Sequence, residues 1–243
     1  MNFQTIPHCL DKNINFMTIQ PLNIASKIDH TILRPEATKQ DIIKLCQEAM
    51  QYSFFSVCVN SSWVPTAVRE LEDSNVVVAA VSGFPLGAMS TAAKAYESQL
   101  AAGQGAKEID TVLNIGKLKE GDLRNVEEDL KMVVVSANGC GALVKVILET
   151  CLLTPKEITT ACLLAMDAGA EFVKTSTGFS KSGTSIEAVQ LMRRVVGTNC
   201  QVKASGGIKD FSTAQAMIDA GADRLGTSSG IAIVNEELLR SKQ

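Results

Sequence analysis

Two lysines and an aspartate lie far apart in the chain, and each stands inside an apolar run. Lys174 follows Glu-Phe-Val, Lys203 follows Gln-Val, and Asp110 stands between Ile109 and Thr111. A lysine is costly to bury unless it is paired or used. For any one of these lysines, a surface position at the end of a strand is an equally good explanation. Their recurrence in comparable segments makes that explanation less favourable for the whole set.

These residue types suggest carbonyl chemistry. A lysine is a nucleophile only as a neutral amine, and its ordinary pKa is about 10.4. A second ammonium group nearby disfavours the charged form and so favours the amine. One of the lysines could then attack a carbonyl to form an imine while the other stays charged, and a carboxylate in reach such as Asp110 could move protons. An imine draws electrons from the adjacent carbon, so this set predicts an aldolase that needs no metal.

The segments that carry these residues alternate between strand-like and helix-like patterns. The strand-like runs are apolar almost throughout, as expected for strands covered on both faces. The predicted strands are 27–33, 54–60, 76–82, 107–114, 142–149, 171–176, 201–205 and 222–228. The predicted helices are 40–52, 63–73, 91–102, 121–137, 155–169, 185–196, 212–220 and 229–239, with Thr38, Thr154 and either Asp210 or Ser212 as N-caps.

Similar phrases lead into three of the strands: AAGQGAKEID, DAGAEFVKTS and DAGADRLGTS. Repeated turns of this kind are typical of stacked β/α units. We therefore predict an α/β fold, a single-domain (β/α)8 TIM barrel over residues 21–243, with residues 1–20 as an N-terminal extension. The alternative is an open doubly wound sheet. That fold usually has a glycine-rich fingerprint after its first strand, and IDHTILRPE is not one.

In such a barrel, alternate side chains of each strand point into the lumen, and the active site lies at the carboxyl ends of the strands. The alternation places Asp110, Lys145, Lys174 and Lys203 on the lumen side of four neighbouring strands. Each of these charges would cost several kcal/mol if it were buried without a partner. We therefore expect them to form one cluster.

Glycine-rich and serine-rich turns follow the last three strands. They contain Gly178, the pair Gly206 and Gly207, and the pair Ser228 and Ser229. The loops after the seventh and eighth strands of these barrels commonly bind phosphate together with a helix N-terminus. The turns thus predict a phosphorylated small molecule as the substrate.

Composition excludes several classes of function. A net charge of -3 and a pI near 5.5 give no attraction to nucleic acid or to an anionic membrane. No apolar run approaches the roughly 18 residues that a membrane span needs, and no secretory signal is recognised. The seven cysteines form no CxxC pair and there are two histidines, so we expect a cytoplasmic protein with no metal site and no cofactor.

The chain closely resembles the deoxyribose-phosphate aldolase family. The matching stretches are KIDHTIL, VCVN, GFPLG, KEIDTVLNIG, VKVILET, EFVKTSTGF, VKASGGI and LGTSSG. The resemblance implies a class I aldolase with a barrel fold. It would cleave 2-deoxy-D-ribose 5-phosphate reversibly to D-glyceraldehyde 3-phosphate and acetaldehyde, without a metal.

The resemblance also implies a role for individual residues. Lys174 would form the Schiff base, and Lys203 would be the second lysine. Asp110 would relay protons together with Lys203 and a water molecule. The phosphate positions would be Gly178, Gly206, Gly207, Ser228 and Ser229, and the other pocket positions would be Asp29, Cys58, Lys145 and Thr177.

Other readings stay open at this point. The chain could be another Schiff-base aldolase or a transaldolase for a different phosphosugar. It could also be a phosphosugar-binding barrel without catalysis, although such a protein would have no reason to keep two lysines and an aspartate in its lumen. A homodimer or a higher homo-oligomer is the expected assembly.

Overall fold

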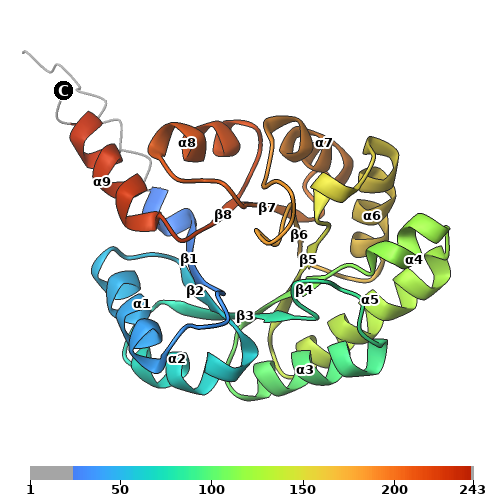
Figure 1. Cartoon of the computed structure of the whole chain (residues 1–243), viewed down its shortest axis with the longest axis horizontal. Helices are drawn as coiled ribbons and strands as arrows, with labels where there is room; N and C mark the ends of the chain where they lie inside the picture. The colour runs from blue at the N-terminus through green and yellow to red at the C-terminus, as the bar shows by residue number, and fades with distance from the viewer. Residues whose placement is uncertain (1–23, 242–243) are drawn as a thin grey trace, which may run out of the picture.

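The strands are short runs rich in valine, isoleucine and alanine, and they close on themselves. The computed structural model describes residues 24–241, and in it eight parallel strands form a barrel in which each strand pairs with the next and β8 pairs with β1 (Figure 1). The strands are β1 (Ile28–Ile32), β2 (Ser56–Val59), β3 (Val77–Ser82), β4 (Glu108–Val112), β5 (Leu143–Ile147), β6 (Phe172–Lys174), β7 (Gln201–Ser205) and β8 (Arg224–Thr227). The predicted (β/α)8 TIM barrel is confirmed.

The helices form a ring outside the strands (Figure 1). They are α1 (Lys39–Gln51), α2 (Val64–Glu70), α3 (Thr91–Gly103), α4 (Ile115–Glu120), α5 (Leu123–Asn138), α6 (Pro155–Asp167), α7 (Ile186–Val196), α8 (Phe211–Asp219) and α9 (Gly230–Arg240). Short 3-10 helices lie at η1 (Ile24–Lys27), η2 (Ser61–Trp63) and η3 (Thr150–Leu152).

Local sequence determines where several helices begin. Thr38 and Thr154 each form a capping box with the third residue of the helix that follows, α1 and α6 respectively. Asp210, rather than Ser212, caps α8 by accepting a hydrogen bond from the Thr213 amide. The caps predicted at these helices therefore lie where the sequence placed them, with the choice between Asp210 and Ser212 now made.

One helix was not predicted. The sequence predicts a single helix from residue 121, whereas α4 occupies residues 115–120 before α5 begins. The Asn114 side chain accepts a hydrogen bond from the Lys117 amide and so starts α4. Gly121 ends it with a φ of 82°, a conformation that glycine adopts readily. The two signals lie only seven positions apart in the sequence, which is why one longer helix was the simpler expectation.

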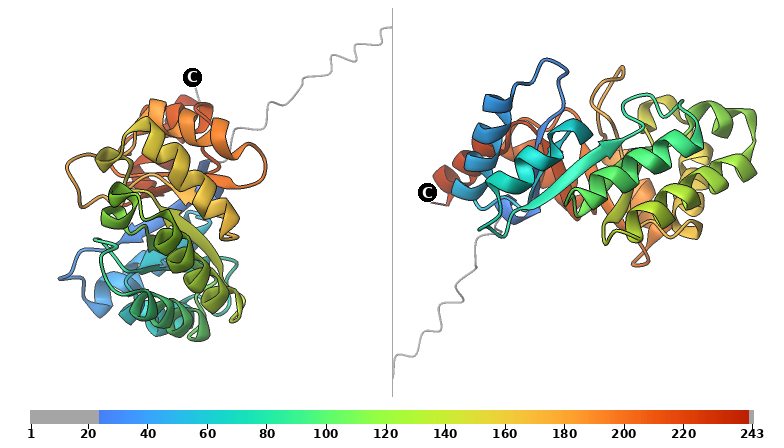
Figure 2. Two further views of the ribbon diagram at one scale, coloured as in Figure 1. Left: turned by 90° about the vertical axis from the view of Figure 1, so that its right-hand side faces the viewer. Right: turned by 90° about the horizontal axis from the view of Figure 1, so that it is seen from below.

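Alternation along the strands separates two interiors. Side chains such as Ile109, Val144 and Val202 face outward and belong to the main apolar core between the sheet and the helices. The opposite side chains, among them Asp110 and Lys145, are adjacent in register and face the lumen. At the carboxyl end, the loops after β1 and β6 (blue and orange) project beyond the helices (Figure 2). The barrel thus has a closed charged interior and one open mouth.

Two further predictions concern an N-terminal extension and the absence of a membrane span. The N-terminal extension predicted over residues 1–20 lies outside the residues that the structure describes. Within residues 24–241, none of the helices combines the length and apolar character required to cross a membrane.

Candidate active site

Asp110 is the centre of the lumen cluster. It lies in the middle of β4 and is fully buried. Lys174, the last residue of β6, donates a hydrogen bond to Oδ2 of Asp110 at 2.9 Å, and Lys203 of β7 donates to the same oxygen at 2.7 Å. Lys174 and Lys203 are direct partners in the register between β6 and β7. The two lysines predicted to be catalytic therefore meet at one oxygen of the predicted catalytic aspartate.

A second tier of charges supports this centre. Lys145 of β5 donates to Oδ1 of Asp110 at 2.8 Å and also pairs with Glu108. Lys203 also pairs with Asp29 of β1. Two of the four predicted pocket residues, Asp29 and Lys145, therefore belong to the cluster, and both are completely buried.

Opposite charges outweigh burial in this cluster. Burial acts to raise the pKa of Asp110, but the three surrounding ammonium groups bring that pKa well below its ordinary value. Burial likewise acts to lower the pKa of Lys203, and the carboxylates of Asp110 and Asp29 raise it above its ordinary value instead. Asp110 is therefore ionised and Lys203 is an ammonium ion at neutral pH.

Lys174 differs from the other charged groups because it reaches a cavity. The cavity has a volume of about 430 Å³ and opens at the carboxyl end of the barrel. Lys174 is 3% exposed, and it is the only member of the lumen cluster among the residues that line this cavity. A carbonyl compound that enters from the mouth would meet the Lys174 amine before any other charged group of the cluster.

The predicted phosphate residues line the other side of the same cavity. They are Gly178, Gly206, Gly207, Ser228 and Ser229. Gly206 and Gly207 have φ angles of 85° and 82°, which other residues rarely adopt. Ser229 lines the cavity and immediately precedes α9, so the N-terminus of an 11-residue helix begins beside the cavity. This arrangement suits an anion.

Side-chain hydrogen bonds join the loops that contain the predicted phosphate residues, which follow β6, β7 and β8. Ser205 donates its hydroxyl to the backbone oxygen of Ser176, and Thr175 donates to that of Ser205. Thr227 donates to the backbone oxygen of Ile208. A Cβ atom at Gly183 would lie only 2.1 Å from the oxygen of Gly206, so the loop after β6 packs directly on the loop after β7.

The lumen side chains of β2 and β3 are neutral by contrast. Cys58, Ala79 and Val81 form a small buried apolar cluster with Leu33, and Phe84 packs against it. Burial raises the pKa of the Cys58 thiol, so this cysteine is a packing residue and not a thiolate. Cys58 was predicted as a pocket position, and it lies in the wall of the lumen.

Thr177 lies at the mouth, where it lines the cavity. Both its amide and its hydroxyl donate to the buried carboxylate of Glu149, which follows β5. Glu149 itself adopts a φ of 46°. Glu149 therefore holds the Lys174-to-Gly178 turn in place.

Several polar residues of the site were not singled out from the sequence. Arg34 and Lys209 line the cavity beside the phosphate loops and bring positive charge to its rim. Arg224 lies in the lumen and donates to Asp29 at 2.8 Å. The signal for Arg224 was available, because it stands two positions before Gly226 and so shares its lumen face. The loop cations carry no such periodic signal.

Metal ligands are not gathered in this part of the chain. Within residues 24–241, no group of three or more His, Cys, Asp or Glu side chains is arranged to hold a metal ion. The carboxylates of the lumen contact lysine and arginine side chains instead.

A (β/α)8 barrel whose cavity is lined by a lysine, with a buried aspartate that contacts this lysine and a second one, defines a class I aldolase, a carbon–carbon lyase. Comparison with known proteins agrees. The profile of the DeoC/LacD family aldolases matches residues 24–236, and the chain belongs to this family.

Individual relatives are similar over nearly the whole chain. The deoxyribose-phosphate aldolase of Geobacillus sp. (strain WCH70) is 54% identical over 219 residues, 90% of this chain and 98% of that protein. A solved structure described as QR15, an aldolase, superimposes with a TM-score of 0.86 at 39% identity, covering 91% of this chain and 98% of that one. The tetrameric deoxyribose phosphate aldolase from Aeropyrum pernix gives a TM-score of 0.83 at 33% identity, covering 90% and 92%.

Proposed function

We propose that the chain is a deoxyribose-phosphate aldolase that uses Lys174 as its Schiff-base lysine. The substrate is 2-deoxy-D-ribose 5-phosphate, and the products are D-glyceraldehyde 3-phosphate and acetaldehyde. The observation that carries this assignment is the position of Lys174. It shares one oxygen of Asp110 with Lys203, and it alone of that trio lines the cavity.

The reaction begins at C1 of the open-chain sugar. The neutral amine of Lys174 adds to the aldehyde carbon, and the carbinolamine takes up a proton and loses water to give an iminium ion. A base removes the proton of the C3 hydroxyl, the C2–C3 bond breaks, and its electron pair forms the enamine between C1 and C2. The C3 fragment leaves as D-glyceraldehyde 3-phosphate.

The second half returns the enzyme to its starting state. Protonation of the enamine at C2 gives the iminium ion of acetaldehyde, and water hydrolyses it to acetaldehyde and the free amine. Asp110, which contacts Lys174, and Lys203, which contacts the same Asp110 oxygen, are the groups that exchange these protons. The same steps in reverse join the two aldehydes.

The phosphate group lies at the other side of the cavity in this proposal. Amides of the loops that contain Gly178, Gly206 and Gly207 and of the start of α9 bind its oxygens, and Lys209 at the rim adds positive charge. This location leaves the aldehyde end of the sugar directed at Lys174.

A trapping experiment tests the proposal. The protein is incubated with acetaldehyde and borohydride, and the modified peptide is mapped by mass spectrometry. We expect an ethyl group on Lys174, and we expect cleavage of 2-deoxy-D-ribose 5-phosphate that a chelator does not inhibit. The Lys174→Met variant should lose both the label and the activity, whereas Lys181→Met, at an exposed lysine of the following loop, should keep both.

The outcome separates the alternatives. A label on Lys203 would contradict the assigned nucleophile. A label on Lys174 without cleavage of this sugar would indicate another Schiff-base aldolase or a transaldolase, and the absence of any label would indicate a binding barrel without catalysis.

We also propose that the protein is a cytoplasmic homo-oligomer. Exposed apolar side chains lie on the adjacent helices α3 and α5, including Tyr96, Leu100, Met132 and Val135. The relative from Aeropyrum pernix is described as a tetramer. The described cysteines are free thiols, as expected in a reducing compartment. Light scattering after gel filtration measures the mass, and a monomer would contradict the assembly.

A further inference from the structure

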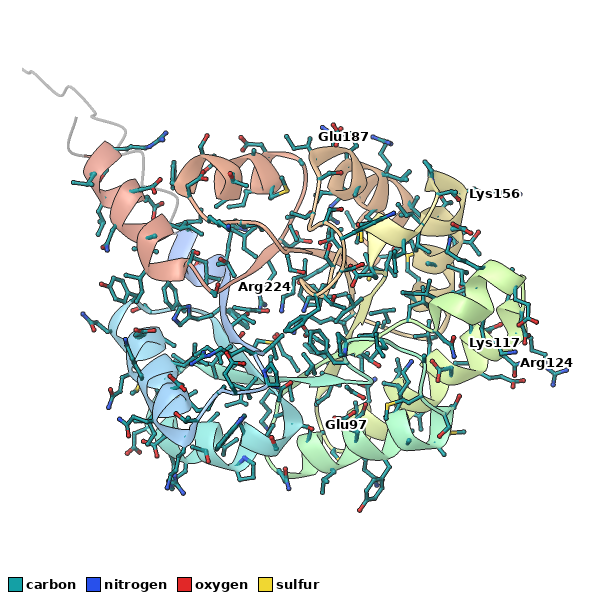
Figure 3. The ribbon with its side chains drawn as sticks, in the orientation of Figure 1. Glu97, Lys117, Arg124, Lys156, Glu187 and Arg224 are labelled. Atoms are coloured by element: carbon teal, nitrogen blue, oxygen red, sulfur yellow. The ribbon has the colours of Figure 1, made fainter. Side chains whose placement is uncertain are left out.

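The lumen contains several charged residues that the proposed mechanism does not use, and Glu108 and Arg224 are two of them. Glu108 and Arg224 are the first residues of β4 and β8, so they lie at the end of the strands away from the mouth. Neither lines the cavity. Figure 3 shows Arg224 well inside the ring of helices, whereas Lys117, Arg124 and Lys156 lie on its outside.

Arg224 and Glu108 are connected to the centre of the site by contacts. Arg224 donates to Asp29 at 2.8 Å and approaches both oxygens of Glu108 at 3.4 Å. Glu108 pairs with Lys145, which donates to Asp110. The guanidinium group also stacks over the ring of Phe55, with 3.3 Å from its central carbon to the ring centroid. Packing and hydrogen bonds thus fix the guanidinium in the lumen.

The charges of this connected cluster do not balance when all are ionised. In the part of the chain that the structure describes, it contains four cationic side chains and three carboxylates. The cations are Lys145, Lys174, Lys203 and Arg224, and the carboxylates are Asp29, Glu108 and Asp110. The cluster has an excess of one positive charge among side chains that are almost completely buried, and releasing one proton removes that excess.

The contacts determine which cation can release it. Arginine stays protonated in proteins. Lys145 has three carboxylates within 4.0 Å, and Lys203 has two. Lys174 contacts a single carboxylate, through an oxygen that Lys203 also uses. Lys174 is therefore the least stabilised as an ammonium ion.

We propose that Arg224 and Glu108 are positioning residues of the reaction, which set the fraction of Lys174 that is a neutral amine through the charge balance of the lumen. Arg224 contributes the positive charge that makes the excess, and Glu108 reduces it. The inference rests on the proposed function, because it takes Lys174 as the amine that forms the imine.

Other charged groups around Lys174 are arranged differently. Cys58 on β2 is a thiol, and the lumen side chains of β3 are neutral. Glu149, beyond β5, binds Thr177 and forms none of the ion pairs found within residues 24–241. Arg34 and Lys209 stand at the open rim, where water screens them. Apart from the groups that contact Asp110, the charges at the closed end of the lumen should therefore have the largest influence on the protonation of Lys174.

The test measures imine formation against pH with a substrate that carries no charge of its own. Each variant is incubated with acetaldehyde and cyanoborohydride, and the rate of ethylation of Lys174 is followed by mass spectrometry. We expect Arg224→Met to move the half-maximal rate to higher pH by about one unit, and Glu108→Gln to move it to lower pH. The double variant should return close to the wild-type profile.

Two further variants serve as controls. Arg224→Lys keeps the charge and should keep the wild-type profile. Arg193→Met removes a partly buried arginine that pairs with Asp223 outside the lumen, and it should leave the profile unchanged. Circular dichroism confirms that each variant is folded, and Arg224→Gln replaces Arg224→Met if the latter does not fold.

The results distinguish this inference from the proposed function. Shifts in opposite directions that cancel in the double variant support the charge balance. Shifts in the same direction, or unchanged profiles in folded variants, overturn it while Lys174 still becomes labelled. If the wild-type protein shows no label on Lys174, the proposed function itself is wrong.

Discussion

Within residues 24–241, lysines are buried in two regions, and one of these regions contains the lysine that lines the candidate active-site cavity. Lys94 lies in α3, between the sheet and α5, and is fully buried. It donates to Asp129 at 2.5 Å and to the backbone oxygen of Val112 at 2.6 Å. The lumen lysines are as deeply buried, but they share carboxylates with one another. Burial of a lysine therefore does not distinguish a structural pair from a reactive site.

Two properties make the difference. The first is the ratio of cations to carboxylates. Lys94 pairs with one carboxylate, that of Asp129, whereas the lumen cluster contains more cations than carboxylates. The second is access, because Lys174 lines a cavity and Lys94 does not line the same cavity. Burial lowers the pKa of Lys94 more than Asp129 raises it, whereas two carboxylates outweigh burial at Lys203. A single carboxylate thus does not offset the effect of burial on the pKa of Lys94, whereas two carboxylates do so for Lys203.

The largest difference between the two regions should appear in activity. Replacing Lys203 with leucine removes one ammonium group from Oδ2 of Asp110 and leaves Lys174 on that oxygen, with Lys145 still on Oδ1. We expect kcat/KM for 2-deoxy-D-ribose 5-phosphate to fall by about 10²–10⁴-fold, as for the loss of a proton-transfer group. The measurement is a steady-state assay of the folded variant, with Lys94→Met as the matched buried-lysine control.

An equal loss of activity in both variants would contradict the difference in function between the lumen lysines and Lys94. If Lys203→Leu instead kept its activity and its pH profile, the second lysine would have no part in the reaction.

The next difference should appear in stability. In Lys94→Met the carboxylate of Asp129 stays buried without a cation, which typically costs about 3–5 kcal/mol in the free energy of unfolding. Adding Asp129→Leu removes that charge, and the double variant should recover most of the loss. Urea unfolding measures both, and turnover per folded molecule should stay close to the wild-type value.

A structural pair and a catalytic one respond oppositely to such a double replacement. If the double variant lost turnover while regaining stability, Lys94 would have to act on the site through Val112 at the end of β4.

The sequence predicted the barrel and the grouping of its candidate catalytic residues because both depend on periodicity. Alternation along the strands placed Asp110, Lys174 and Lys203 on one side of the sheet, and the register brings them into contact. Their chemical roles stay predictions. The phosphate residues lined the cavity for the same reason, since they directly follow strand ends.

Residues without a periodic context were harder to predict. Lys94 lies in an alanine-rich helix, where a lysine is normally an exposed residue, and only the packing of α5 on α3 shows its partner. Arg34 and Lys209 belong to loops, whose path depends on tertiary contacts. Glu149 holds Thr177 from an unusual backbone conformation after β5. In each case the position of the side chain depends on a contact between segments that are far apart in the sequence, and periodicity within one segment does not reveal such a contact.

The smallest expected difference lies in the alkaline pH dependence of stability. The pKa of Lys94 is lower in the folded protein than in the unfolded chain, where it is about 10.4. Between these two values the unfolded chain binds more protons, so the contribution of Lys94 to the free energy of unfolding rises with pH. The pKa of Lys203 is raised by folding, so its contribution is constant below pH 10.4 and falls only above it.

Subtraction isolates the effect of Lys94. The free energy of unfolding of Lys94→Met/Asp129→Leu is subtracted from that of the wild-type protein at each pH below about 10.4. We expect the difference to change in favour of the wild type as pH rises, by less than about 1.4 kcal/mol per pH unit. A difference that falls with pH would mean that Asp129 holds the Lys94 proton more tightly than water does. The pair would then resemble the lumen lysines in its electrostatics, and access to the cavity alone would separate the two regions.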